Sequence, residues 1–194
     1  SQDGNFSFQG KKLIFIKDDD QYEYELIGSE SGNKKALRDG TYTVKMDIPY
    51  PYTYSDTNEL PKCEVSASST SYTLSLSERM KWDFTLNGDK TLETGSVIGT
   101  EENPGEYHGL LVIADGGNTK FDVKGTNVQF NKNTIVKIPV KGTGKVTING
   151  GDTKYSGYTL DGKALTEAGC GEYNNKAEGS YMILQATASG QYIE

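Results

Sequence analysis

Apolar and polar residues alternate along several short segments of the chain, as in β-strands that bury one face. The clearest segment is 39–48, in which apolar side chains occupy every second position. Alternation also marks 11–17, 22–26 and 80–86. The sequence therefore predicts a strand at each of these four places.

The longest series of apolar runs lies between Tyr107 and Asn149. Each run is short and is closed by Gly, Asn or Lys, residues that favour turns or lie on exposed edges. The pattern predicts a β-meander or Greek-key segment of an antiparallel sandwich or barrel. No window combines a helical period with caps at both ends, so we expect little helix.

Two further segments give more specific predictions. Residues 63–67 and 72–76 are predicted to be strands joined by the polar linker 68–71, which favours a hairpin between them. The segment from Pro49 to Tyr54 contains two prolines and three tyrosines, which predicts a stiff, aromatic and exposed loop.

The fold class predicted from these patterns is all-β, with antiparallel β-sandwiches, two packed in tandem. A boundary near Ser77–Arg79 divides the chain into 1–79 and 80–194. The halves would hold about six and about seven or eight strands, in the range of sandwich domains. One larger sandwich is the alternative.

Charge and length narrow the choice of partners. The net charge is −7, with 20 basic and 27 acidic residues interspersed, so no basic surface for a nucleic-acid backbone is expected. No apolar run is long enough to span a membrane. We expect neither nucleic-acid binding nor membrane insertion.

The chain has two cysteines and ends abruptly at both termini. Cys63 and Cys170 fall one in each half, and two unpaired thiols are favoured over a bridge between them. The chain shows no signal peptide and starts and stops abruptly at Ser1 and Glu194. We expect a piece of a longer secreted or cell-surface protein, with covalently attached neighbouring domains.

The first half contains a motif that resembles a known module. Residues 37–44 read LRDGTYTV, and 71–76 read SYTLSL. These strands resemble those of small transthyretin-like or carboxypeptidase-regulatory-like β-sandwiches, which serve as spacers in secreted bacterial enzymes. The resemblance implies a β-sandwich spacer or binding module over 1–79.

The second half resembles a different module. The motifs are KWDF, GEYHGL, VQFN, IPVKG and GQYI, which begin at Lys81, Gly105, Val128, Ile138 and Gly190. They are similar to a β-sandwich module that accompanies pectate lyases, pectin esterases and other polysaccharide-degrading enzymes of bacteria. The resemblance implies a non-catalytic, carbohydrate-binding module over 80–194, with a pectin-like plant polysaccharide favoured as its ligand.

The residues themselves offer little catalytic chemistry. His108 is the one histidine, which excludes a metal site built on several imidazoles. No Gly-x-Ser-x-Gly elbow and no phosphate-binding Gly loop is present. A carboxylate pair for glycoside hydrolysis stays open, although no Asp or Glu lies inside a continuous apolar run that would raise its pKa. We expect a protein that is not an enzyme and needs no cofactor.

Two acidic turns are candidates for structural calcium. Asp18–Asp20 and Asp115–Asn118 could supply oxygen ligands. Neither has the alternating oxygen spacing of a calcium loop, which favours a solvated turn at both.

Sugar binding is the more specific hypothesis. A sugar ring has an apolar face and a hydroxylated edge, so its site needs flat aromatics beside polar partners. Three clusters of tyrosines with polar neighbours provide this combination. The candidate ligand-binding residues are Tyr50, Tyr52, Tyr54, Tyr155, Tyr158, Tyr173 and Lys176, with Lys154, Asn174 and Asn175 beside them. Trp82 alternates with Met80 and Phe84, which favours a core position.

Overall fold

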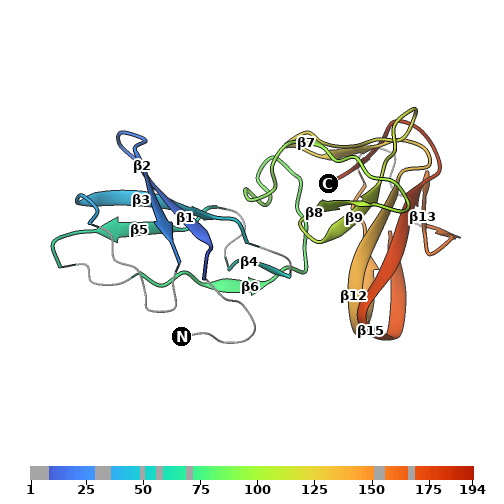
Figure 1. Ribbon diagram of the computed structural model, residues 1–194. Coiled ribbons are helices and arrows are strands. Elements are labelled where there is room, and N and C mark those ends of the chain that lie inside the picture. The colour runs from blue at the N-terminus through green and yellow to red at the C-terminus, as the bar shows by residue number, and fades with distance from the viewer. Residues whose placement is uncertain are drawn as a thin grey trace. The chain divides into compact units, whose positions relative to one another are not determined.

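A computed structural model describes residues 9–28, 36–48, 51–55, 59–68, 72–150, 156–165 and 169–194. Within these ranges every strand pairing is antiparallel, which confirms the all-β class. The same ranges contain no helix, and hence none suited to crossing a membrane. The chain divides into two compact units, Ser1–Arg79 and Met80–Glu194 (Figure 1).

Unit 1 is built on a four-stranded sheet with the strand order β2-β1-β3-β5. Its strands are β1 (Lys12–Lys17), β2 (Glu23–Ile27), β3 (Gly40–Met46) and β5 (Lys62–Val65). Phe15 lies opposite Val44, and Tyr42 lies opposite Cys63, so these four side chains share one face. They form the buried core of this unit. The alternation over 11–17, 22–26 and 39–48 predicted three of these strands correctly.

A second, two-stranded sheet in unit 1 pairs β4 (Tyr52–Tyr54) with β6 (Leu76–Glu78). The prediction of an exposed loop at Tyr52 and Tyr54 was therefore wrong. The predicted hairpin between 63–67 and 72–76 was also wrong, because β5 pairs with β3, and β6 pairs with β4. Alternation identifies a strand but does not specify the strand beside it.

Unit 2 contains a six-stranded sheet with the order β14-β13-β15-β12-β9-β8, and a four-stranded sheet with the order β16-β11-β10-β7. The larger sheet consists of β8 (Gly105–Tyr107), β9 (Leu110–Ile113), β12 (Ile135–Thr147), β13 (Tyr158–Leu160), β14 (Lys163–Ala164) and β15 (Cys170–Ala186). The smaller sheet consists of β7 (Gly95–Ser96), β10 (Phe121–Val123), β11 (Val128–Phe130) and β16 (Gln191–Ile193).

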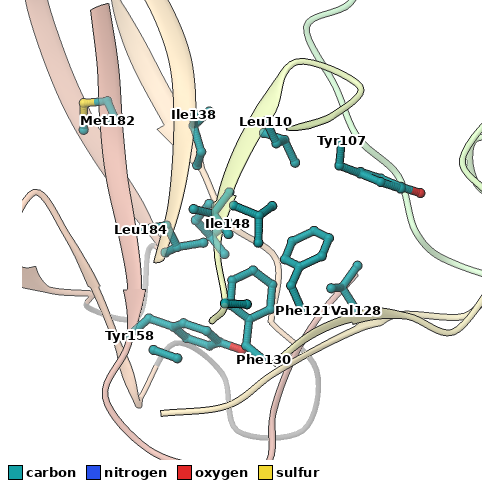
Figure 2. Packing of buried hydrophobic residues seen from close by; sticks show 14 of the residues in the cluster. Tyr107, Leu110, Phe121, Val128, Phe130, Ile138, Ile148, Tyr158, Met182 and Leu184 are labelled. Carbon is teal, nitrogen blue, oxygen red and sulfur yellow. The ribbon is translucent and has the colours of Figure 1, made fainter. Parts of the chain in front are cut away.

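One hydrophobic core lies between the two sheets of unit 2. Phe121 and Phe130 reach it from the smaller sheet, and Ile138 and Leu184 reach it from the larger one (Figure 2). The chain changes sheet between β9 and β10, and again between β11 and β12. The stretch 107–149 is therefore not a single meander but supplies both sides of the core. A tandem of two complete sandwiches stays a prediction.

The strands β12 and β15 pair along most of their length and lie side by side in Figure 1 as a long two-stranded ribbon. Their register shifts around Gly142 and Gly144, where β15 carries extra residues. The first part of β15 lies close to core side chains. A Cβ added at Gly171 would lie 2.7 Å from Leu160 Cδ2 and 3.2 Å from Met182 Cε. Tyr173, in the same part of β15, also packs against the core.

The segment 80–86 is not a strand, so that prediction was wrong. Met80 and Leu86 are 85% and 65% exposed, whereas Phe84 is buried. Trp82 is half-buried and packs against the core, as its spacing from Phe84 suggested. Its indole Nε1–H donates to the His108 carbonyl at 3.0 Å. Side-chain anchoring, not strand pairing, therefore holds this segment.

Candidate functional site

Two of the tyrosines proposed as sugar platforms are buried. Tyr54 is 4% exposed and Tyr158 is 2% exposed, so neither ring can present a face to a ligand. Assigning them to the ligand-binding set was wrong. Tyr54 is an inward-facing residue of β4, and Tyr158 is an inward-facing residue of β13. Tyr50, Tyr155 and Lys154 lie outside the described residues.

Tyr158 belongs to the core of unit 2. Its ring meets Phe130 edge-on, with the ring centroids 6.1 Å apart (Figure 2). Its hydroxyl finds no hydrogen-bond partner among the described residues, and burial raises its pKa above the ordinary tyrosine value. An aromatic ring in this position stabilises the fold.

The remaining predicted residues are half-buried and lie in strands. Tyr52 is in β4, and Tyr173 and Lys176 are in β15. Asn174 and Asn175 follow Tyr173 in the same strand and bond to Thr143. The Tyr173 ring lies over Gly144 on the facing strand. Sugar binding by Tyr52, Tyr173 and Lys176 stays a prediction.

The described part of unit 1 has a pocket that the sequence did not reveal. Its volume is about 330 Å³, and Tyr22, Tyr24, Ala36, Leu37 and Arg38 line it. We call it the tyrosine pocket. It lies at β2, the edge strand of the four-stranded sheet, beside the segment that leads into β3.

Strand geometry explains why two tyrosines meet here. Tyr22 and Tyr24 are two positions apart, so their side chains point to the same side of the chain. Their ring centroids are 4.7 Å apart at an interplanar angle of 57°. Tyr24 in turn meets the buried ring of Tyr42 edge-on at 5.9 Å. The core therefore fixes Tyr24, and Tyr24 supports Tyr22.

The opposite wall of the pocket is tied to the same sheet. The Tyr42 hydroxyl donates to the Arg38 carbonyl at 2.7 Å. Leu37 packs against the core, whereas Arg38 is exposed. The backbone at Arg38 is thus anchored while its guanidinium remains accessible to solvent.

The turn that precedes Tyr22 is held by its own acidic residues. The Tyr22 N–H donates to Asp20 Oδ1 at 3.0 Å, and Gln21 adopts a left-handed φ of 58°. Asp18 accepts a hydrogen bond from Lys62 Nζ at 2.8 Å and one from Thr43 Oγ1 at 2.8 Å. These two bonds, Lys62 first, lower the pKa of Asp18. In this turn the carboxylates fix the loop that presents Tyr22.

Tyr22 and Arg38 provide complementary chemistry at the mouth of the pocket. Tyr22 is 60% exposed, which leaves a ring face open to a ligand. A guanidinium offers planar paired donors to hydroxyl or carboxylate oxygens. The alternation of Tyr22, Tyr24 and Leu26 predicted the strand, but it did not indicate which of these side chains face solvent. Tyr22 directly precedes β2, after the turn at Asp20 and Gln21, and is 60% exposed.

His108, the chain's one histidine, lies in a tight turn between β8 and β9. His108 and Gly109 have φ values of 48° and 89°, as in the two-residue turns of β-hairpins. The His108 Nε2 lies 2.8 Å from Glu93 Oε2, and the Glu106 carboxylate accepts from the Gly109 N–H at 2.5 Å. The imidazole is thus paired with a carboxylate at the hairpin tip.

No protein-family model matches the chain, and it has no match among curated proteins or solved structures. Function is therefore inferred from the chemistry of the site.

Proposed function

We propose that this protein is a non-catalytic module that binds polysaccharide or oligosaccharide through the tyrosine pocket. The observation that carries the proposal is the placement of Tyr22, Tyr24 and Arg38 around one pocket at a sheet edge. An exposed aromatic ring covers the apolar face of a sugar, and the guanidinium donates to its oxygens. The pocket is at the small end of the size range of ligand sites, about 300–1,000 Å³.

Arg38 also bears on the class of polysaccharide. A carboxylate on a sugar ring would accept two parallel hydrogen bonds from a guanidinium, and such pairs are stronger than neutral ones. This supports a pectin-like, acidic plant polysaccharide as the favoured ligand. The negative net charge of the chain makes a local cation important for capturing an acidic polymer.

Binding of one or a few sugar units in such a pocket would be weak by itself. Its effect would come from effective concentration, because a tethered binder keeps an attached enzyme or cell near its polymer. The proposed setting is a secreted or cell-surface bacterial protein with neighbouring domains. A structural spacer or a protein-binding adhesin module is the alternative.

Affinity electrophoresis of the whole chain in gels with pectin, polygalacturonate, xylan, glucomannan or starch tests the proposal. We expect at least one glycan to retard the protein, and Tyr22→Ala to abolish the retardation. Tyr72→Ala is the matched control, because Tyr72 is 39% exposed in the same unit but lies outside the pocket.

The opposite results separate the alternatives. A chain that no glycan retards would be a spacer or an adhesin. Equal loss in Tyr22→Ala and Tyr72→Ala would mean that the pocket is not the site. Release of reducing sugar from any of the polymers would show an enzyme instead.

A further inference from the structure

The two walls of the tyrosine pocket are fastened to two consecutive residues of β3. Tyr42 points into the core of unit 1, and its hydroxyl donates to the carbonyl of Arg38, which lines one wall. Thr43 is the next residue, so its side chain points to the other face of the sheet. There its hydroxyl donates to Asp18 Oδ1 at 2.8 Å. Asp18 begins the turn that leads to Tyr22, which lines the other wall.

The turn between Asp18 and Tyr22 transmits the position of Asp18 to the pocket. The Gln21 N–H donates to the Lys17 carbonyl at 2.8 Å, and the Lys17 N–H donates to the Tyr22 carbonyl at 3.0 Å. The Asp18 N–H donates to the Thr41 carbonyl at 3.0 Å. Because these bonds close the turn on the strands beside it, a displacement of Asp18 would also displace Tyr22.

Lys62 supplies the second bond to Asp18. Its Nζ donates to Asp18 Oδ2 at 2.8 Å from β5, which lies at the opposite edge of the sheet from β2. The Lys62 side chain is 55% exposed and that of Asp18 is 30% exposed, so water screens this pair. We therefore expect the Lys62 pair to contribute less than the bond from Thr43. Both carboxylate oxygens of Asp18 are thus held by the sheet.

Packing alone restrains Tyr22 weakly. Its ring meets Tyr24, but the residue is 60% exposed, so much of the ring has no neighbour. Its N–H is held by Asp20 Oδ1, a bond that stays within the turn. The bonds of Asp18 tie this turn to β3 and β5, two strands on the far side of β1. The orientation of Tyr22 therefore depends on the attachment of its turn to the sheet.

We propose that Asp18 and Thr43 are positioning residues, which hold Tyr22 in place in the tyrosine pocket. Neither of them lines the pocket, so neither touches the sugar. They act by fixing the Tyr22 ring before the ligand arrives, which lowers the cost of ordering it on binding. The inference rests on the proposed function for its ligand, but the placement of the Tyr22 ring can be measured without one.

Thr43→Val is the direct test, because it removes the hydroxyl and keeps the shape of the side chain. The ring centroids of Tyr22 and Tyr24 lie 4.7 Å apart, and we expect the nuclear Overhauser contacts between these rings to weaken in the variant. Binding of trigalacturonate, followed by NMR titration of the full ¹⁵N-labelled chain, should weaken by about threefold to tenfold, the size of one net hydrogen bond. Thr43→Ser keeps the hydroxyl and should restore both.

Two further variants order the contributions to this attachment. Asp18→Ala removes both side-chain bonds and should weaken binding by about tenfold or more. Lys62→Met should weaken it by about twofold, because an exposed ion pair contributes little. If Asp18→Ala fails to fold, Thr43→Val and Thr43→Ser carry the comparison.

The same sheet offers matched controls. Thr41 is half-buried like Thr43 and lies on the same face of β3, and within the described ranges its side chain makes no hydrogen bond. Lys12 pairs with Glu25 across β1 and β2, away from the turn. Thr41→Val and Lys12→Met should leave both the affinity and the contacts between the Tyr22 and Tyr24 rings unchanged.

A Thr43→Val chain that keeps both its ring contacts and its affinity would overturn the proposal. A loss of stability or of affinity while the ring contacts persist would also overturn it, because Thr43 would then act on something other than the Tyr22 ring. If trigalacturonate does not bind the parent chain, acidic-sugar binding by the pocket fails. The ring contacts in Thr43→Val and Thr43→Ser then still decide whether Thr43 positions Tyr22.

Discussion

The hydroxyl of Tyr54 forms two hydrogen bonds with the backbone of a single residue, Met46. The Met46 N–H donates to the hydroxyl oxygen at 2.6 Å, and the hydroxyl donates to the Met46 carbonyl at 3.1 Å. Met46 is the last residue of β3, and Tyr54 is the last residue of β4. One side chain thus joins the two sheets of unit 1.

We expect Tyr54→Phe to destabilise unit 1 by about 1–3 kcal/mol, because it leaves a buried N–H and C=O without their partner. Hydrogen exchange of the β3 and β4 amides would measure the change. Tyr72→Phe is the control, because Tyr72 is 39% exposed whereas Tyr54 is 4% exposed. An unchanged exchange rate in Tyr54→Phe would show that the two bonds contribute nothing. Retardation by a glycan should not change, since Tyr54 is outside the tyrosine pocket.

The ribbon of β12 and β15 should be sensitive to one methyl group at Gly144. An added Cβ would lie 2.6 Å from the Tyr173 hydroxyl oxygen and 2.9 Å from its Cζ. Because Tyr173 packs against the core, the ring cannot move away freely. We expect Gly144→Ala to destabilise unit 2 by about 1–3 kcal/mol, as overpacking does.

A double-mutant cycle checks this cause. In the Tyr173→Ala background the clash is gone, so Gly144→Ala should cost much less than in the parent chain. Unfolding of unit 2 can be followed by the fluorescence of Trp82, the single tryptophan. Equal costs in the two backgrounds would mean that Tyr173 is not the obstacle.

Asp122 should make unit 2 sensitive to acid. The hydrogen bond from Lys124, with help from Ser96 and Lys120, holds the pKa of Asp122 below its ordinary value. A depressed folded pKa adds stability above the unfolded pKa of about 3.9, and this stability is lost as the pH falls through the folded pKa. Between pH 6 and pH 5 the contribution should be constant, and it should decline below about pH 4.

Asp122→Asn tests this pH dependence. The amide cannot titrate, so the variant should lose less free energy of unfolding than the parent chain as the pH falls below about 4. Urea unfolding monitored by Trp82 fluorescence at several pH values measures the difference. Parallel curves for the two proteins would contradict the prediction.

Arg38→Gln separates sugar stacking from charge recognition in the tyrosine pocket. We expect it to weaken binding to polygalacturonate by about tenfold or more, because a charge-assisted pair contributes more than a neutral hydrogen bond. Binding to fully methyl-esterified pectin should change less. Binding of the parent chain to polygalacturonate should also weaken as salt increases. Equal effects on both polymers would rule out carboxylate recognition by Arg38.

The sequence by itself determined the all-β class and the strands at 11–17, 22–26 and 39–48. A period of two fixes which side chains share a face, and this is a property of neighbouring residues alone. The same reasoning failed over 80–86, where Met80 and Leu86 are exposed and Trp82 is held by the carbonyl of His108. An alternating sequence forms a strand only where another strand is available to pair with its backbone.

Only the tertiary structure decided which tyrosines face solvent. Tyr24 and Tyr54 both occupy alternating positions, yet Tyr24 lines a pocket and Tyr54 is buried against Met46. The difference comes from what each ring meets, since β2 and β4 both have one strand neighbour, but the Tyr54 hydroxyl is bonded to the end of β3 and Tyr24 lies beside the exposed Tyr22. Exposure depends on which segments pack together, and local periodicity carries no information about that choice.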